Sequence, residues 1–154
     1  MNVAWGVFPD GDRNVGSEQS IEPAENGLVK ITYRFDVGWK FIRLAPRNET
    51  LRKIEGAPKE LSFRVAGDGS GNSVRLRYAD ATGQTFQVNG GIMSEKKSYY
   101  FSFPLDGRDA SYWGGPNDGK ITYPIMFDSM VIDGTRNADG PHSVEISSPV
   151  LIYE

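Results

Sequence analysis

The sequence predicts an all-β protein, a two-sheet antiparallel β-sandwich with jelly-roll-like connections. Short segments that alternate apolar and polar residues recur along the chain. Turn-forming residues separate them, and the 154 residues include 18 glycines and 9 prolines. Helix-forming residues do not gather into a stretch with a period of 3.6 residues. The length fits a single domain, residues 1–154, large enough to bury about two thirds of its unfolded surface.

About eight segments are expected to form strands, because each alternates between an apolar and a polar face. In chain order they are residues 28–35, 39–44, 61–65, 74–78, 85–89, 100–105, 121–132 and 143–153. The longest irregular piece, residues 45–59, is expected to contain a short helical turn. This number of strands fits two stacked antiparallel sheets joined by Greek-key or jelly-roll connections.

Composition excludes several classes of function. The chain has no cysteine, which rules out thiol catalysis, cysteine-ligated zinc and iron–sulfur chemistry. A formal net charge of −3 argues against a nucleic-acid partner, which usually requires a basic surplus. No apolar run approaches the length that spans a bilayer, so no membrane partner is expected. The first residues lack the charged and apolar regions of a signal peptide.

Two segments resemble a known family. Residues 67–86 read GDGSGNSVRLRYADATGQTF, and residues 112–134 read YWGGPNDGKITYPIMFDSMVIDG. Both resemble β-sandwich carbohydrate-binding modules of the jelly-roll, galactose-binding-like kind that are appended to bacterial glycoside hydrolases. The resemblance implies a non-catalytic module that binds a polysaccharide or oligosaccharide. It also implies a covalently linked catalytic domain, which the module targets to its substrate, within a secreted or cell-surface protein.

A polar sheet face is the first candidate binding site. If Leu76 points into the core, the alternation places Arg75 and Arg77 on the outer face of the sheet. The other residues expected on this face or beside it are Gln87, Asn89, Tyr100, Arg64 and Ser62. Planar guanidinium and amide groups match sugar hydroxyls with paired hydrogen bonds, although any solvated sheet face uses similar residues. If both arginines face the ligand, an acidic or sulfated glycan is favoured over a neutral one.

Aromatic side chains are the second candidate. Tyr112 and Trp113 precede a Gly-Pro-Asn-Asp-Gly turn, where regular structure is not expected to shield them. An indole can stack on the apolar face of a sugar ring, and burying about 60 Å² would give roughly 1.5 kcal/mol. The alternative is that Trp113 caps the open end of the sandwich. Trp39 follows a turn and is either a second platform or a core anchor.

No cofactor is required by these residues, but the resemblance implies a structural calcium ion near the start and end of the chain. Glu18 and Glu22 lie in the corresponding region, and carboxylates suit a hard cation. Against it, Ser147, Ser148 and Pro149 stand where the family usually has an acidic residue on its last strand.

Catalysis is not expected. The single histidine, His142, is expected in a turn after Gly140 and Pro141, where it would serve neither as a general base nor as a metal ligand. The acidic residues fall mainly in turns, and no pair marks a glycosidase site. Two alternatives to a glycan-binding module stay open. One is an ancillary structural domain that packs on a catalytic partner, and the other is a small polysaccharide lyase or hydrolase.

Overall fold

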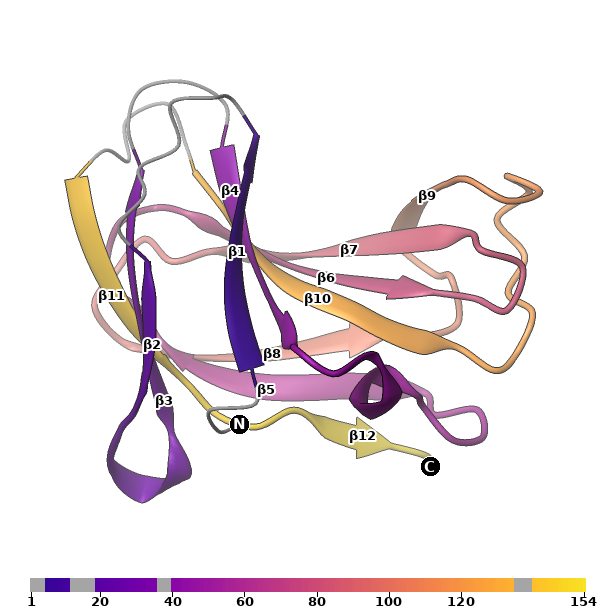
Figure 1. Ribbon diagram of the computed structural model, residues 1–154, viewed down its shortest axis with the longest axis horizontal. Coiled ribbons are helices and arrows are strands. Elements are labelled where there is room, and N and C mark those ends of the chain that lie inside the picture. The colour runs from indigo at the N-terminus through magenta and orange to yellow at the C-terminus, as the bar shows by residue number, and fades with distance from the viewer. Residues whose placement is uncertain (1–4, 12–18, 36–39, 135–139) are drawn as a thin grey trace.

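Two antiparallel sheets form a β-sandwich, which confirms the predicted fold class. The computed structural model describes residues 5–11, 19–35, 40–134 and 140–154 (Figure 1). Sheet A contains, in spatial order, β1 (Trp5–Gly11), β4 (Lys40–Pro46), β10 (Met126–Asp133), β6 (Ser73–Ala79), β7 (Thr85–Ile92) and β9 (Ala110–Trp113). Sheet B contains β8 (Ser98–Pro104), β5 (Glu60–Ala66), β12 (Val150–Ile152), β11 (Gly140–Ile146), β3 (Val29–Phe35) and β2 (Ser20–Pro23).

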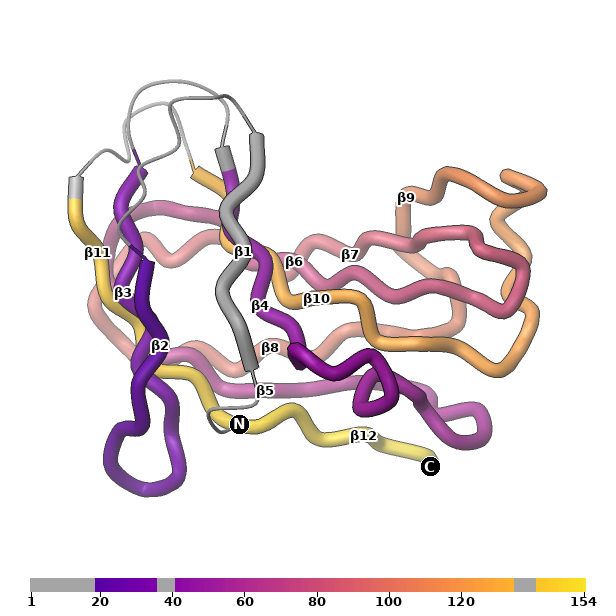
Figure 2. Tube along the Cα trace, in the orientation of Figure 1, coloured from indigo at the N-terminus to yellow at the C-terminus, as the bar shows by residue number. Residues whose placement is uncertain are grey.

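Both sheets join strands that are distant in the sequence. In sheet A, β10 lies between β4 and β6, and in sheet B, β11 lies between β3 and β5. One edge of β5 pairs with β8 along its whole length, and the other edge pairs with β11 and then β12. The chain trace in Figure 2 shows the resulting crossings between the two layers, which are the connections expected of a jelly roll.

The core consists of the inward-facing residues of both sheets. Ile31, Phe63 and Leu76 are almost completely buried, as the alternation in their strands predicts. Aromatic rings pack within this layer, and the stacked rings of Tyr78 and Phe86 have centroids 5.2 Å apart. Burying a large apolar side chain contributes about 1.5–3 kcal/mol, so this layer is the main source of stability.

The described residues form twelve strands instead of the eight expected, and prolines account for one shortened strand and one divided strand. The expected strand over residues 121–132 begins only at Met126, after Pro124. The expected strand over residues 143–153 is divided into β11 and β12, and Pro149 lies in the break. Proline has no N–H to donate, so it interrupts a ladder inside a sheet. Two other additional strands, β2 and β9, have four residues each, too few for a clear alternating pattern.

Of the two predictions about irregular segments, the helical turn within residues 45–59 is confirmed and the turn at His142 is not. The helical turn expected within residues 45–59 is confirmed as η2 (Glu49–Arg52), a 3₁₀ helix in which the Asn48 side chain accepts a hydrogen bond from the Thr50 N–H. A second 3₁₀ helix, η1 (Glu25–Gly27), joins β2 and β3. The turn expected at His142 is wrong, because His142 lies within β11. Its partner is Tyr33 of β3, and the two ring centroids are 5.5 Å apart.

Candidate functional site

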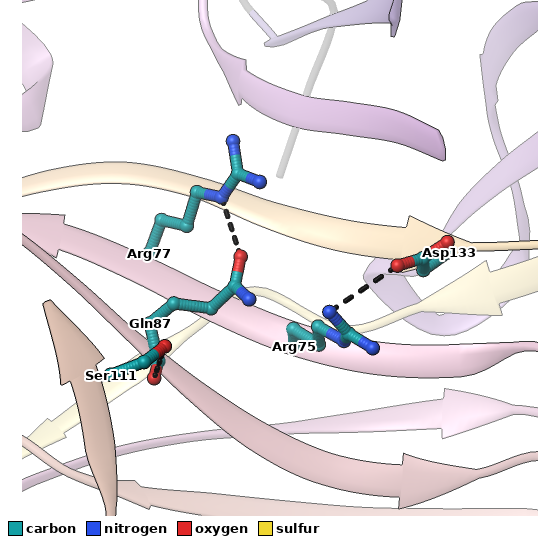
Figure 3. A network of polar contacts seen from close by, with 5 residues as sticks. All are labelled: Arg75, Arg77, Gln87, Ser111 and Asp133. Atoms are coloured by element: carbon teal, nitrogen blue, oxygen red, sulfur yellow. Dashed lines mark hydrogen bonds and ion pairs between the residues drawn. The ribbon is translucent and has the colours of Figure 1, made fainter. Parts of the chain in front are cut away.

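Four of the predicted site residues lie together on the outer face of sheet A. Arg75 and Arg77 alternate with the buried Leu76 on β6, so their side chains leave the core. In the ladder between β6 and β7, Arg75 is opposite Asn89 and Arg77 is opposite Gln87. The Arg77 Nε–H donates a hydrogen bond of 2.7 Å to Gln87 Oε1, which fixes the direction of the guanidinium (Figure 3). The expected polar face therefore exists around these four residues.

An acidic residue that sequence reasoning missed, Asp133, belongs to the same face. Its carboxylate lies 3.3 Å from Arg75 Nη1, across the ladder between β10 and β6 (Figure 3). Burial raises the pKa of Asp133, although the positive charges of Arg75 and Arg77 oppose the shift. The residue stands at the end of an apolar run before Gly134, where it reads as a turn residue. Its pairing with Arg75 depends on a strand far away in the sequence.

Trp113 completes this face instead of capping the sandwich. It ends β9, pairs with Thr85 of β7, and is 42% exposed. The guanidinium carbon of Arg77 lies 5.3 Å from the centroid of the Trp113 ring and 4.9 Å from that of Phe41. Cations within about 6 Å of an aromatic ring are attracted to its face. The sequence analysis treated the polar sheet face and Trp113 as two separate candidate sites. In the structure they form one surface.

Phe41 is a second member of this face that the sequence did not single out. It lies on β4 opposite Asp133 and alternates with the fully buried Ile42, yet it is itself only 5% exposed. Sequence reasoning normally assigns an apolar strand residue to the core. It therefore does not recognise an aromatic residue such as Phe41, which is buried on the outer side of the sheet.

Tyr112 lies on the other side of β9 from Trp113, so the expectation that it assists Trp113 is wrong. Adjacent residues of a strand point to opposite faces. The Tyr112 ring packs against Phe86 of the core, with centroids 6.2 Å apart. It also lies directly over Gly119, where a Cβ atom would be only 2.7 Å from the ring. Tyr112 is itself 44% exposed, and its ring supports the loop after β9 at Gly119.

Three other predicted members are not on this face. Tyr100 lies on β8 and both Ser62 and Arg64 lie on β5, so all three belong to sheet B. Their alternation was read correctly, but the strands pair in the other sheet. Trp39 lies outside the described residues, so its predicted role stays a prediction.

A buried polar cluster joins the turn at residues 80–84 to the loop at residues 114–122. Asp80 Oδ1 accepts hydrogen bonds from the Thr82 and Gln84 N–H groups, both at 3.0 Å, and Asp80 Oδ2 accepts one from the Thr122 N–H at 3.1 Å. Gln84 is fully buried, and its Oε1 accepts a hydrogen bond of 2.8 Å from the Gly119 N–H. These contacts join residues 80–84 to the loop that follows Trp113.

The Asp80 carboxylate is stabilised in its charged form. Burial alone would raise the pKa of Asp80, but the hydrogen bonds from Thr82, Thr122 and Gln84 outweigh burial and lower it. Hydrogen bonds thus hold the Asp-Ala-Thr-Gly-Gln segment against the Gly-Gly-Pro-Asn-Asp-Gly segment. They act on the site indirectly, by positioning Trp113.

The described residues contain no group of three or more side chains suited to hold a metal ion. Glu22 is exposed on β2 opposite Lys30, while Glu18 falls outside the described residues. Ser147, one of the residues that argue against calcium, has its Oγ 2.7 Å from the Arg64 N–H, from which it accepts a hydrogen bond. The calcium site stays a prediction. In the same described ranges, no helix has the length and apolar character of a membrane span.

Several solved structures with a similar fold are carbohydrate-binding modules. A family 11 module from Clostridium thermocellum, in complex with a β-1,3-1,4-mixed-linked tetrasaccharide, matches with a TM-score of 0.64 and 13% identity over 99% of this chain and 90% of that one. The family 11 module of the cellulosomal cellulase Lic26A-Cel5E of the same organism matches with a TM-score of 0.59 and 11% identity, over 98% and 88% of the two chains. A structure described as "CBM4 structure and function" matches with a TM-score of 0.50 and 10% identity, over 99% and 96%.

These likenesses confirm the predicted resemblance at the level of the fold. The β-sandwich of carbohydrate-binding modules extends over nearly the whole chain. No protein-family model and no curated protein matched the sequence. Because the identities are low, the ligand must be argued from the residues of this chain.

Proposed function

We propose that this protein is a non-catalytic glycan-binding module that holds a segment of an oligosaccharide or polysaccharide on the outer face of sheet A. The observation that supports it best is the half-exposed Trp113 ring beside the Arg77 guanidinium, next to Gln87 and Arg75. The same fold occurs in a module in complex with a tetrasaccharide. An aromatic platform surrounded by fixed planar hydrogen-bonding groups suits a sugar ring, which has apolar faces and a polar rim.

Each group has a distinct part in binding. The exposed part of the Trp113 ring covers apolar C–H groups of one sugar unit, and burying about 60 Å² would contribute roughly 1.5 kcal/mol. The Arg77 guanidinium, already directed by Gln87, donates to ring or hydroxyl oxygens. Because this guanidinium is held before the ligand arrives, less conformational entropy is lost on binding.

The ion pair on this face weakens the case for an acidic glycan. An acidic or sulfated ligand was the expectation if both arginines faced it. Arg75, however, is ion-paired with Asp133, so its charge is already compensated and attracts an anionic sugar less strongly. We therefore propose a neutral polymer, and a mixed-linked β-1,3-1,4-glucan is the first ligand to test.

A wider role is proposed with this binding function. One of the similar modules belongs to a cellulosomal cellulase. A covalently linked catalytic domain in a secreted or cell-surface protein would gain effective concentration on an insoluble polymer without any change in its chemical step. A purely structural domain is less well supported, because it would bury Trp113, which is 42% exposed. Within the described part of the chain, we assign no residue pair a catalytic role.

The experiment is affinity electrophoresis and calorimetric titration with mixed-linked β-glucan, in parallel with xylan, mannan, polygalacturonate and a sulfated galactan. Trp113→Ala is expected to weaken binding about tenfold, which corresponds to roughly 1.4 kcal/mol. Trp113→Phe should retain part of the affinity because it keeps a flat ring. Circular dichroism checks that both variants fold, and EDTA tests the calcium proposal. Unchanged binding by a folded Trp113→Ala variant would contradict the proposed site.

A further inference from the structure

The outer face of sheet B has an exposed aromatic ring of its own, Tyr100 on β8. Its side chain is 73% exposed, the highest value among the exposed large hydrophobic residues in the described part of the chain. The flanking Phe101 is buried in the core, so the strand alternation directs Tyr100 away from it. Sheet A and the Trp113 surface lie on the opposite side of the sandwich (Figure 1).

The Tyr100 ring lies across the sheet. Tyr100 is paired with Arg64 of β5, whereas Ser62 is paired with Ser102. The Tyr100 hydroxyl nevertheless lies 3.2 Å from Ser62 Oγ, so the side chain reaches diagonally over β5. Ser62 is fully buried although it points outward, as expected for a residue beneath a ring. The hydroxyl end of the side chain is therefore held by β5, while most of the ring remains exposed.

A cleft opens beside this ring because two neighbouring strands separate. β11 pairs with β5 only at Glu145–Ala66 and Ile146–Val65, while it follows β3 from Ile146 up to Gly140. The space left between β11 and the ends of β5 and β8 has a volume of about 660 Å³. Its polar lining residues are Asp68, Lys96, Lys97, Ser98, His142 and Ser143. This volume falls in the range of about 300–1,000 Å³ that is usual for small-molecule sites.

The ring lies near the cleft without lining it. Ser98, which lines the cleft, is two residues before Tyr100 on β8, so the two side chains share the outer face about 7 Å apart. A single exposed aromatic residue is ordinary on a protein surface. An exposed ring within two residues of a polar cleft, however, offers an apolar platform and hydrogen-bonding groups to neighbouring units of a sugar chain.

The charges of the cleft fit hydroxyl groups better than an anion. Lys97 Nζ lies 2.9 Å from the Glu95 carboxylate, and Asp68 adds a second negative charge to a lining that also contains Lys96. Asp68 is held in place by the Tyr33 hydroxyl at 2.6 Å and the Ser70 N–H at 3.0 Å. The cleft therefore offers donors and acceptors in similar measure. Sugar hydroxyls both donate and accept hydrogen bonds, whereas a carboxylate or sulfate only accepts.

We propose that the outer face of sheet B is a second glycan-binding site, in which Tyr100 stacks on one uncharged sugar unit and the cleft receives the hydroxyls of its neighbour. This site is separate from the sheet A face and goes beyond the function proposed above. With sites on opposite faces, one module joins two glycan chains or two segments of one chain.

The test is an amide chemical-shift titration of the ¹⁵N-labelled protein, in which each face reports separately. The probes are the mixed-linked β-glucan tetrasaccharide, xylo- and manno-tetraose, and, as charged probes, tetragalacturonate and a sulfated galactan oligosaccharide. We expect an uncharged probe to shift amides of β5, β8 and β11 in wild type and in Trp113→Ala. Tyr100→Ala should weaken these shifts at least tenfold in affinity. The control Tyr153→Ala, which removes another exposed tyrosine, should leave them unchanged.

Each other outcome is decisive. Shifts confined to β6, β7 and β9 with every probe would overturn the second site and leave the sheet A proposal standing. Shifts on sheet B alone, unaffected by Trp113→Ala, would support the second site and contradict the first. If only the charged probes shift sheet B, the assignment of an uncharged sugar is wrong. Sheet B shifts that persist in Tyr100→Ala would overturn the role of its ring.

Discussion

Trp113 and Tyr100 are both exposed aromatic residues on outer sheet faces, but the molecule places them by different means. Tyr100 lies inside β8, which pairs with β5 residue by residue from Ser98 to Pro104. Trp113 is the last residue of β9, a four-residue strand at the edge of sheet A. Beyond Trp113, the chain is fixed by the buried cluster of Asp80 and Gln84.

The difference shows how much support a platform residue needs. A residue inside a long paired strand is oriented by the ladder itself, since the alternation fixes its direction. A residue at the end of a short edge strand needs contacts between loops. The Trp113 surface should therefore be sensitive to changes that lie away from it, and the Tyr100 surface should not.

The largest expected effect comes from Asp80→Ala. It removes the acceptor of the Thr82, Gln84 and Thr122 N–H groups in a site that is 5% exposed. We expect the free energy of unfolding to fall by about 3 kcal/mol, since each unsatisfied buried donor costs about 1–3 kcal/mol. Denaturant unfolding gives this value. Hydrogen exchange should accelerate at the Gly119 and Thr122 amides far more than along β8.

Asp106→Ala is the matched control for Asp80→Ala. Asp106 is also a turn aspartate, but it is exposed, and its carboxylate accepts from the Arg108 N–H at 3.0 Å. A loss below about 1 kcal/mol is expected there. Equal exchange rates along β8 and at Gly119 in Asp80→Ala would show that the two surfaces are not supported independently.

A smaller effect is expected from Gly115→Ala, compared with Gly83→Ala. Both glycines have positive φ, +51° and +85°, so both alanines meet a backbone penalty of about 1–2 kcal/mol. At Gly115 the new Cβ would also lie 2.9 Å from the Thr82 carbonyl oxygen, whereas nothing lies within 4 Å at Gly83. Gly115→Ala should therefore cost more stability and weaken sheet A binding. Equal unfolding midpoints would mean that the loops do not press together.

The smallest effect is a difference in pH dependence between two carboxylates of this region. The lowered pKa of Asp80 makes its contribution to stability complete above the ordinary value of 3.8, and that contribution is lost as the pH falls through the lowered pKa. The raised pKa of Asp133 has the opposite effect on the pH dependence of stability. Its contribution is greatest below 3.8 and declines as the pH rises through the raised pKa.

Thermal unfolding between pH 2 and pH 6 tests these signs. Asp80→Asn should flatten the loss of stability at the acid end, and Asp133→Asn should flatten a decline above pH 3.8. If both variants changed the curve in the same direction, one of the two pKa shifts would have the wrong sign.

The sequence by itself determined the direction of the polar side chains in the long alternating strands. Arg75, Arg77 and Tyr100 point outward, as their alternation predicts, because the direction of a strand residue depends only on its own strand. The all-β class follows from the same local signal. In the two glycine-rich segments that carry the family resemblance, the turns likewise follow from local turn-forming residues.

Only the tertiary structure decided which of these side chains meet. β8 pairs with β5 and β9 with β7, so Tyr100 and Trp113 lie on opposite faces of the molecule. Asp133 forms an ion pair with Arg75, and Asp80 accepts a hydrogen bond from the Thr122 N–H, 42 residues away. Strand pairing depends on packing between segments that are distant in the chain, and residue alternation has no information about it. The composition of each surface is therefore a property of the fold, while the outward direction of its residues is a property of the sequence.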